Sequence, residues 1–139
     1  MNRYLLDSNH ASPLVTLHHP LRRRVLQAID SGDAFFIAIP VLTETVFGLS
    51  TLPRWLQNLS EWTRLRETID CFIPDEGDAQ HAAELQLVLR KRGRRLETVD
   101  ALIAAVALHH DLVLLTADRD FDAIPGLQLE NWLAPFNTR

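Results

Sequence analysis

Four acidic side chains stand where a buried segment ends or where a helix begins, so they could meet at one place in the fold. Asp7 ends the first apolar segment, Glu44 and Asp100 lie near the starts of two predicted helices, and Asp118 follows an apolar run at residues 112–115. Two unit charges 4 Å apart repel by about 1 kcal/mol in water and by about 4 kcal/mol at an effective dielectric of 20. Divalent cations relieve that repulsion, and Mg2+ and Mn2+ prefer carboxylate and water ligands. The four carboxylates are therefore candidate metal ligands.

A magnesium or manganese ion at such a site would support the hydrolysis of phosphate esters. A bound divalent cation lowers the pKa of a water ligand, orients that water and offsets charge on the phosphoryl oxygens. The six histidines and the single cysteine do not have the spacing of a zinc site. The residue types thus favour hard, oxygen-binding cations over zinc.

Each acid also has an ordinary structural explanation. Asp7 could begin a turn, Glu44 could lie on a helix surface, and Asp100 could be an N-terminal charge that the helix dipole favours. Asp118 and Asp120 could be turn or capping residues. Because strand ends and the following helix starts gather at one edge of a parallel α/β sheet, the joint order of the acids favours a shared site.

Strands and helices alternate along the chain in the way that a parallel sheet requires. Short apolar segments predict strands at residues 3–6, 35–39, 68–73, 112–115 and 127–129. Apolar residues at helical spacing predict helices at about residues 19–29, 41–49, 52–65, 78–92 and 98–109. Parallel strands need helical crossovers, so we expect an α/β fold with helices on both faces of the sheet. No repeat or linker divides the chain, and residues 1–139 are expected to form one domain.

Composition indicates a soluble, folded protein. Hydrophobic residues make up 47% and charged residues 23% of the 139 residues, close to the averages for globular proteins. No apolar run approaches the roughly 20 residues that cross a bilayer, and the N-terminal segment lacks the apolar region of a signal peptide. We therefore expect a cytoplasmic protein without a membrane partner.

Cys71, the single cysteine, lies in an apolar run and is expected to be a buried thiol.

A basic run leaves an RNA contact open despite the net charge of −4. The run consists of Arg90, Lys91, Arg92, Arg94 and Arg95, and it closely precedes Asp100. It could guide RNA phosphates towards a site that is itself negative. It could equally be a solvated helix end, where cations complement the helix dipole. The sequence does not separate these two interpretations.

Four motifs carry a resemblance that spans essentially the whole chain. They are Leu6-Asp7-Ser8-Asn9, Thr43-Glu44 with Gly48, Asp100-Ala101-Leu102-Ile103-Ala104-Ala105, and Leu115-Thr116-Ala117-Asp118-Arg119-Asp120-Phe121. With these motifs the chain resembles the PIN-domain family, and specifically the VapC-like toxins of type II toxin–antitoxin pairs. The family commonly has threonine after its first aspartate, whereas Ser8 here keeps the hydroxyl and loses a methyl group.

The resemblance implies a fold, an activity and a division of roles. The fold is a PIN-like, Rossmann-like three-layer sandwich with a mostly parallel sheet of about five strands flanked by helices, usually assembled as a homodimer. The activity is that of an endoribonuclease that hydrolyses RNA phosphodiester bonds with Mg2+ or Mn2+. By resemblance, the catalytic and metal-binding residues are Asp7, Glu44, Asp100 and Asp118. Ser8, Asn9 and Thr116 would hold them in place, and Asp120 would be an additional acidic residue.

The resemblance also implies two partners besides a second copy of the chain. One is the RNA substrate, and the other is a small antitoxin protein whose chain enters the acidic site and lies along an apolar groove. Apolar residues between Leu52 and Leu65 recur at spacings of three and four and form a stripe that could line this groove or a dimer contact. Core packing explains such a stripe about as well.

Three other functions fit parts of the sequence. A haloacid-dehalogenase-like phosphatase would also have an aspartate after its first strand, but Asn9 stands where its second aspartate is expected and Lys91 is the only lysine. A non-cutting RNA-binding PIN module would normally lack one of the four acids, all of which are present here. A PIN nuclease of RNA maturation or decay, not paired with an antitoxin, is the main alternative to a toxin.

Overall fold

A five-stranded, fully parallel sheet forms the centre of the molecule in the computed structural model, which describes residues 1–133. The strands are β1 (Arg3–Leu6), β2 (Ala34–Ala38), β3 (Ile69–Phe72), β4 (Val113–Leu115) and β5 (Leu129–Glu130). Their order across the sheet is β3-β2-β1-β4-β5, and each neighbouring pair is parallel. The predicted α/β class and parallel sheet are confirmed.

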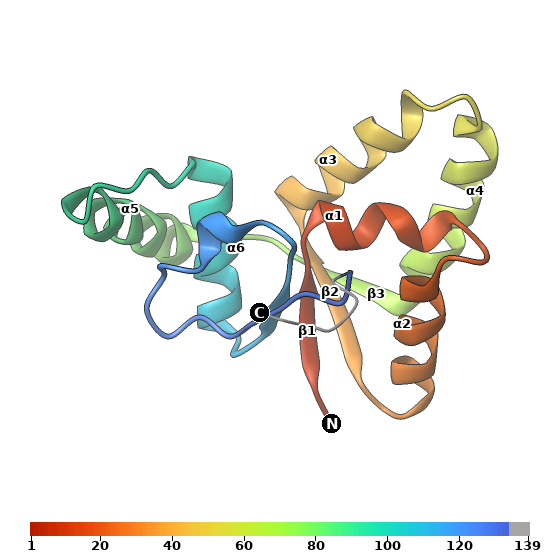
Figure 1. The fold of residues 1–139 in the computed structure, drawn as a ribbon, viewed down its shortest axis with the longest axis horizontal. Coiled ribbons are helices and arrows are strands. Elements are labelled where there is room, and N and C mark those ends of the chain that lie inside the picture. Colours follow the sequence, from red (N-terminus) through yellow and green to blue (C-terminus); the bar gives the residue numbers. More distant parts are fainter. Residues whose placement is uncertain (134–139) are drawn as a thin grey trace.

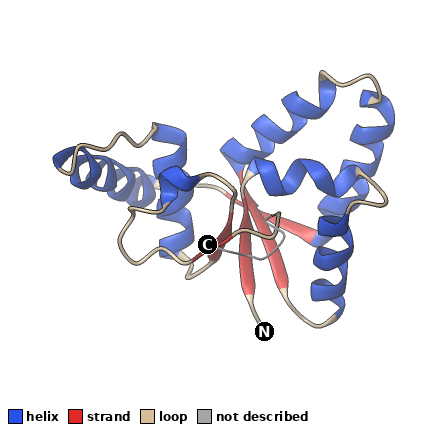
Figure 2. Cartoon of the chain, in the orientation of Figure 1, coloured by secondary structure: helices blue, strands red, loops and turns tan. Residues whose placement is uncertain are grey.

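Helices cover both faces of this sheet and complete three layers. On one side lie α1 (Ser8–Ala11), α2 (Pro20–Asp30), α3 (Ile39–Ser50) and α4 (Trp55–Leu65), and on the other lie α5 (Glu76–Lys91) and α6 (Thr98–His109) (Figure 1). Figure 2 shows the strands as a central layer between the two groups of helices. The three-layer arrangement expected from the sequence is confirmed.

The connections on the β2 side of β1 run over one face of the sheet, and the connection that leads to β4 runs over the other face. The segments that join β1 to β2 and β2 to β3 contain α1 to α4, and the segment that joins β3 to β4 contains α5 and α6. Since β1 pairs with β2 on one side and with β4 on the other, its carboxyl end lies between segments that leave towards opposite faces. Ligands of open α/β sheets bind at such a topological switch point.

Helix α6 is enclosed on almost all sides by its neighbours. Its residues Ala101, Ile103, Ala104, Ala105, Val106 and Ala107 are each at most 1% exposed. Protein interiors are packed as densely as organic crystals, so a helix surrounded in this way resists displacement. The first turn of α6 is therefore a rigid support for any side chain that it carries.

Helices α3, α4 and α5 begin two or three residues away from the positions expected from the sequence. Helix α5 begins at Glu76 because Asp75 and Asp78 form a capping box, in which Asp78 N donates to Asp75 Oδ1 at 2.8 Å and Asp75 N donates to Asp78 Oδ2 at 3.0 Å. Helix α1 was not expected at all. Asp7 caps it by accepting a hydrogen bond from the backbone N–H of Ser8, and its four residues are too few to produce a helical period.

The thiol of Cys71 is partly exposed, so the expectation of a buried thiol is wrong. The reason is that β3 lies at an edge of the sheet, where Cys71 has a strand neighbour, Ile37 of β2, on one side only. The burial that remains raises the pKa of the Cys71 thiol.

The apolar stripe between Leu52 and Leu65 divides into a core part and a surface part. Trp62 and Leu65 are 3% and 7% exposed, whereas Leu52, Trp55 and Leu56 are 46%, 45% and 63% exposed. Core packing therefore explains the second half of the stripe, and its first half is a candidate contact surface.

None of the helices that residues 1–133 form is long and apolar enough to cross a membrane.

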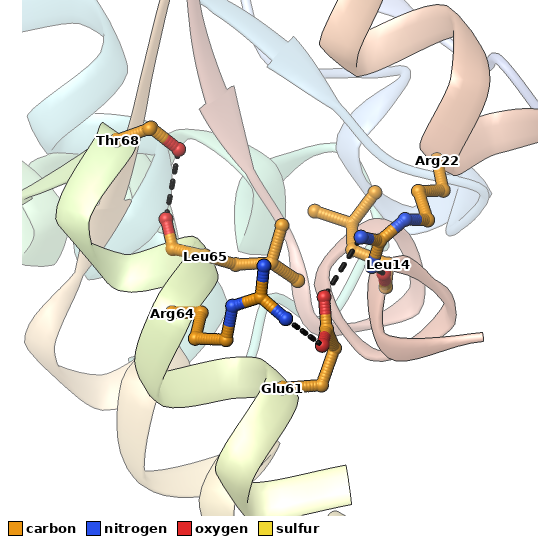
Figure 3. Close-up of polar contacts among 6 residues, drawn as sticks. All are labelled: Leu14, Arg22, Glu61, Arg64, Leu65 and Thr68. Carbon is orange, nitrogen blue, oxygen red and sulfur yellow. Dashed lines mark hydrogen bonds and ion pairs between the residues drawn. The ribbon is translucent and has the colours of Figure 1, made fainter. Parts of the chain in front are cut away.

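An ion pair holds α4 against α2 beside this surface. Arg22 Nη2 lies 2.7 Å from Glu61 Oε1, and the two side chains are 15% and 14% exposed. Arg22 Nη1 also donates to the carbonyl of Leu14 at 2.8 Å, and the more exposed Arg64 approaches Glu61 Oε2 at 3.4 Å (Figure 3). Separating a largely buried pair leaves an unpartnered charge, so this contact fixes the spacing of the two helices.

Candidate metal centre

Asp7 stands at the carboxyl end of β1 and is fixed by three hydrogen-bond donors. The residue is 6% exposed, and its Oδ1 accepts from the backbone N–H of Ser8 at 2.8 Å. Its Oδ2 accepts from the hydroxyl of Thr116 at 2.7 Å and from the amide of Asn9 at 3.4 Å. Because Thr116 directly follows β4, these bonds join the ends of two neighbouring strands.

Asn9 and Thr116 extend the network to the loop that carries Asp118. Asn9 Nδ2 donates to Thr116 Oγ1 at 3.3 Å, and Asn9 Oδ1 accepts from the backbone N–H of Ala117 at 3.1 Å. Thr116 Oγ1 accepts from the backbone N–H of Asp118 at 3.0 Å. The loop after β4 is thereby tied to the segment after β1, and the two acids at these strand ends are held in a common frame.

His10 fixes the orientation of the Asn9 side chain, and the sequence did not reveal this residue. It is completely buried, and its Nε2 accepts from the backbone N–H of Trp132 at 3.0 Å. In the neutral ring Nδ1 must then carry the proton, which it donates to Asn9 Oδ1 at 2.7 Å. The Asn9 amide nitrogen is consequently left to face Asp7. The available signal was a histidine directly after the first motif, next to Ala11.

An aromatic cluster holds Trp132 in turn. Its ring lies edge-on to Tyr4 at 4.9 Å and to Phe35 at 5.9 Å, and the guanidinium of Arg24 lies over it at 3.9 Å. Such aromatic and cation–π contacts contribute about 0.5–1.5 kcal/mol each. The segment after β5 is thus anchored to β1, β2 and α2, and it reaches Asn9 through His10.

Asp100, Asp118 and Asp120 form a compact acidic group at the same edge of the sheet. One carboxylate oxygen from each lies within 4.8 Å of those of the other two. Asp100 belongs to the first turn of α6, and Asp118 caps the short turn Arg119–Phe121 by accepting from the backbone N–H of Asp120 at 2.9 Å. The structure therefore brings both Asp118 and Asp120 within 4.8 Å of Asp100, which makes both candidate ligands.

Burial and the charges of neighbouring carboxylates raise the pKa of acids at this edge. Burial, followed by the charges of Asp7, Asp118, Glu44 and Asp120, raises the pKa of Asp100 to about 6. Burial also raises the pKa of Asp7, although the hydrogen bonds described above act in the opposite direction. Ionised carboxylates at this edge are therefore destabilised until a cation joins them.

Glu44 approaches the site from α3 but lies outside the compact group. Its side chain is exposed, and its pKa is raised by its partial burial and then by the charge of Asp7. An exposed carboxylate on a long side chain can change rotamer to meet a cation or a water molecule. The four acids predicted from the sequence thus converge on one edge, with Glu44 the least constrained of them.

The donor set suits a hard divalent cation. Carboxylate oxygens are the ligands that Mg2+ and Mn2+ prefer, and these ions usually keep several water ligands. A divalent cation is the largest local charge in such a site and lowers the pKa of each acid beside it. The acidic edge fits such an ion on donor chemistry and on charge.

Comparison with known proteins places the chain in a family. The family model of the PIN domain matches residues 4–127. The chain belongs to the PIN-domain family. Ribonuclease VapC51 of Mycobacterium tuberculosis (strain ATCC 25618 / H37Rv) is 32% identical, over 98% of this chain and 96% of its own. The tRNA(fMet)-specific endonuclease VapC of Shigella flexneri is 27% identical, over 95% and 99% of the two chains. Within the PIN-domain family, the chain thus belongs with the VapC proteins.

Solved structures share the PIN fold over nearly the whole chain. VapBC2 from Rickettsia felis, crystallised with a DNA fragment from its promoter, has a TM-score of 0.81 at 25% identity and covers 94% of this chain and 98% of its own. DNA-bound VapBC from Salmonella typhimurium has a TM-score of 0.79 at 23% identity, over 95% and 99% of the two chains. The PIN-like architecture expected from the sequence is confirmed.

The PIN-domain match includes all five acids but ends before Trp132. The contact that Trp132 makes with His10 therefore joins the matched region to a segment beyond it.

A second acidic group lies elsewhere on this PIN domain. Asp75, Asp78 and His109 also bring ligand atoms within 4.8 Å of one another. Here the two carboxylates form the capping box of α5, and His109 Nδ1 lies 2.9 Å from Asp78 Oδ1. The backbone N–H of Asp78 is the main cause that lowers the pKa of Asp75. This group joins the start of α5 to the end of α6, and its hydrogen bonds account for it without a metal ion.

The structure divides the basic run between different surroundings. Arg90, Arg94 and Arg95 line one cavity beside α5. Arg92 donates instead to the carbonyl of Ala123 at 3.4 Å, and Lys91 is exposed in the last turn of α5.

Proposed function

We propose that this chain is a metal-dependent endoribonuclease that hydrolyses RNA phosphodiester bonds and acts as the toxin of a VapBC-type toxin–antitoxin pair. The observation that carries the proposal is the convergence of five acids on one edge, where the pKa of Asp100 rises to about 6. Such an edge favours a divalent cation and the phosphate chemistry that goes with it. Relatives of matching length are named a ribonuclease and a tRNA(fMet)-specific endonuclease, which supports RNA as the substrate.

Asp7, Glu44, Asp100 and Asp118 would hold the cation, and Asp120 stands within reach of the same position. Mg2+ or Mn2+ would supply charge stabilisation at the phosphoryl oxygens and a water ligand whose pKa is lower than that of bulk water. Ser8, Asn9 and Thr116 keep Asp7 in one rotamer, so this ligand needs no reorganisation when the substrate arrives. The exposed Glu44 is free to accept a hydrogen bond from the attacking water.

An antitoxin segment would cover the groove beside the exposed half of the apolar stripe. This cavity of about 570 Å3 lies between α4 and the segment before α2, and its lining includes Val15, Leu17, Leu52 and Pro53. Leu17 is 62% exposed and Leu52 is 46% exposed, and both line the same cavity, so they form the contiguous exposed apolar surface that marks interaction sites. A homodimer contact is the other use that this surface would serve, and in that case the antitoxin would bind elsewhere.

The test is cleavage of a structured RNA pool by purified protein with Mg2+, with Mn2+ and with a chelator. A matched Asp7→Asn and Asp100→Asn double variant serves as the inactive control, with folding verified by circular dichroism. We expect cutting that needs the metal and disappears in the variant. Cutting by the folded double variant would discard the site, and no cutting under any condition by the antitoxin-free wild-type protein would refute the nuclease.

We expect a short antitoxin protein to be encoded next to this gene, and the partner is tested by coexpression with it. We expect that protein to copurify with the wild-type chain and to suppress cleavage. A Leu17→Asp and Leu52→Asp double variant should still cut RNA but escape suppression. Equal suppression of the variant would place the antitoxin elsewhere.

A further inference from the structure

A second cavity, of about 680 Å3, lies at the far end of α5. Its lining comes from the last turns of α5 and from the segment that returns to α6, and it consists of Ala83, Gln86, Leu87, Arg90, Arg94, Arg95 and Leu96. Figure 1 shows this end of α5 projecting away from the sheet, with residues 92–97 returning towards α6. We name it the α5 cavity.

The charge of the α5 cavity is strongly positive. Three guanidinium groups line it, from Arg90, Arg94 and Arg95. Arg95 is paired with Glu97 at 3.2 Å, but the two side chains are 86% and 63% exposed, so this pair is weak and easily exchanged. Planar guanidinium groups bind phosphate oxygens in a bidentate manner, which suits a nucleic-acid strand.

Part of the lining of the α5 cavity is apolar, and the returning segment is held in place. Leu87 is 56% exposed and Leu96 is 4% exposed, so the lining combines an apolar side chain open to solvent with a buried one. Gln86 Nε2 donates to the carbonyl of Leu96 at 3.0 Å and to Thr98 Oγ1 at 3.2 Å, which fastens the returning segment to α5. An apolar surface beside guanidinium groups can take the face of an unstacked base.

We propose that the α5 cavity binds one nucleotide of a single-stranded RNA beside the cleavage site, with its base against Leu87 and its phosphate on Arg90 and Arg94. The proposal rests on the ribonuclease function proposed above and adds a subsite to it. Charge complementarity selects this occupant, because a polyanionic strand matches three arginines, whereas a second copy of the chain would oppose them with arginines.

The α5 cavity lies close enough to the acidic edge for one strand to reach both. Leu96 precedes Asp100 by four residues, so their Cα atoms are separated by at most about 14 Å. At a rise of about 3.4 Å per nucleotide, that distance corresponds to about four nucleotides or fewer of a stacked strand. The positive cavity would also offset the repulsion that an RNA strand meets at the carboxylates.

The experiment measures binding of a fluorescein-labelled, unstructured RNA 12-mer pool by anisotropy in a chelator, over a series of salt concentrations. The Arg90→Gln and Arg94→Gln double variant is compared with an Arg23→Gln and Arg64→Gln double variant, which removes the same charge from exposed positions on α2 and α4. Each phosphate contact on a single strand contributes about 0.7 to the salt slope, and Arg90 and Arg94 share one phosphate. The salt slope of the cavity variant should therefore fall by about 0.7, and its RNA affinity should fall about tenfold. The control should keep the wild-type slope.

Further measurements separate this proposal from its rivals. With Mg2+, KM of the cavity variant should rise about tenfold while kcat stays within about twofold, because the acidic edge is intact.

Equal salt slopes of RNA binding for the two double variants would overturn the proposal. A changed oligomeric state or a loss of antitoxin binding that is confined to the cavity variant would also overturn it. Binding needs no cleavage, so wild-type protein that binds RNA without cutting it would refute the nuclease and still test the cavity. A Leu87→Asp single variant, at an exposed position, should weaken binding as well.

Discussion

Two acidic groups in this molecule have similar geometry and opposite electrostatics. Asp100, Asp118 and Asp120 bring ligand atoms within 4.8 Å, and so do Asp75, Asp78 and His109. The pKa of Asp100 is raised to about 6 by burial and by neighbouring carboxylates, whereas backbone N–H groups and His109 contribute to a lowered pKa of Asp75. Proximity of acids is therefore a weak criterion for a metal site. The sign of the pKa shift shows whether the protein has already neutralised the group.

The largest effect that separates the two groups should be on catalysis. Asp100→Asn removes a candidate ligand from the acidic edge, and we expect RNA cleavage to fall by about 100-fold or more, since even partners of metal ligands contribute 10–100-fold. Asp75→Asn keeps a capping side chain and should leave the rate within about twofold. Initial rates with Mn2+ measure both. A comparable loss in the two variants would mean that the Asp75 group also serves the reaction.

The next effect concerns His10, which acts through Asn9 and not on a ligand directly. His10→Phe keeps a ring but removes both hydrogen bonds, so the Asn9 amide is no longer oriented towards Asp7. We expect affinity for Mn2+, measured by calorimetric titration, to fall about 10-fold. Val25→Ala is the control, because it destabilises the core by a similar amount, about 1–3 kcal/mol, without touching the site. Unchanged Mn2+ affinity in His10→Phe would show that the histidine is merely structural.

A third effect is on stability as a function of pH. Because the folded pKa of Asp100 is about 6 and its ordinary value is 3.8, the folded state binds more protons between these values, and the free energy of unfolding falls as the pH rises through them. The full shift corresponds to about 3 kcal/mol, and solvent screening of this partly exposed group reduces it.

Asp100→Asn removes this penalty because the amide is neutral at every pH. In a chelator we expect its Tm to exceed that of the wild type by several degrees at pH 8 and to equal it at pH 4. Scanning calorimetry at the two pH values measures the difference. A Tm gain of the same size at pH 4 would show that the ionisation of Asp100 is not the cause.

The smallest effect is expected at the capping box. Since the pKa of Asp75 is lowered, its contribution to stability is present above the ordinary value of 3.8 and is lost as the pH falls through the lowered value. Asp75→Ala should lower the Tm by a few degrees at pH 7, and the difference should shrink at pH 2. Thermal melts with and without Mn2+ should give the same Tm difference between the wild type and Asp75→Ala. A larger difference with Mn2+ would indicate that the Asp75 group binds the metal.

Local patterns in the sequence were enough to predict the sheet and the long helices. The apolar segments 3–6, 35–39 and 112–115 overlap β1, β2 and β4 because buried parallel strands consist of continuous apolar residues. The acids could be assigned to one edge because strand ends share it. The exposed half of the apolar stripe was left undecided, because residues that face the core and residues that face solvent follow the same helical period.

Other parts of the site depend on contacts that no local pattern contains. The bond from Trp132 to His10 spans 122 residues, and the aromatic cluster that anchors Trp132 draws on β1, β2 and α2. The nearness of Asp120 to Asp100 follows from a turn of three residues, which is too short to have a period. The basic run could not be divided until the surroundings of Arg92 and Arg94 were known.

The bond between Asp7 and Thr116 also governs when an active enzyme can exist during its own synthesis. Asp7 leaves the ribosome among the first residues, but its partner Thr116 follows 109 residues later, and Trp132 later still. At about 5–20 residues per second, Asp7 waits about 5–20 s for Thr116. A nascent or prematurely terminated chain that ends before Thr116 therefore lacks the frame that positions its first acid.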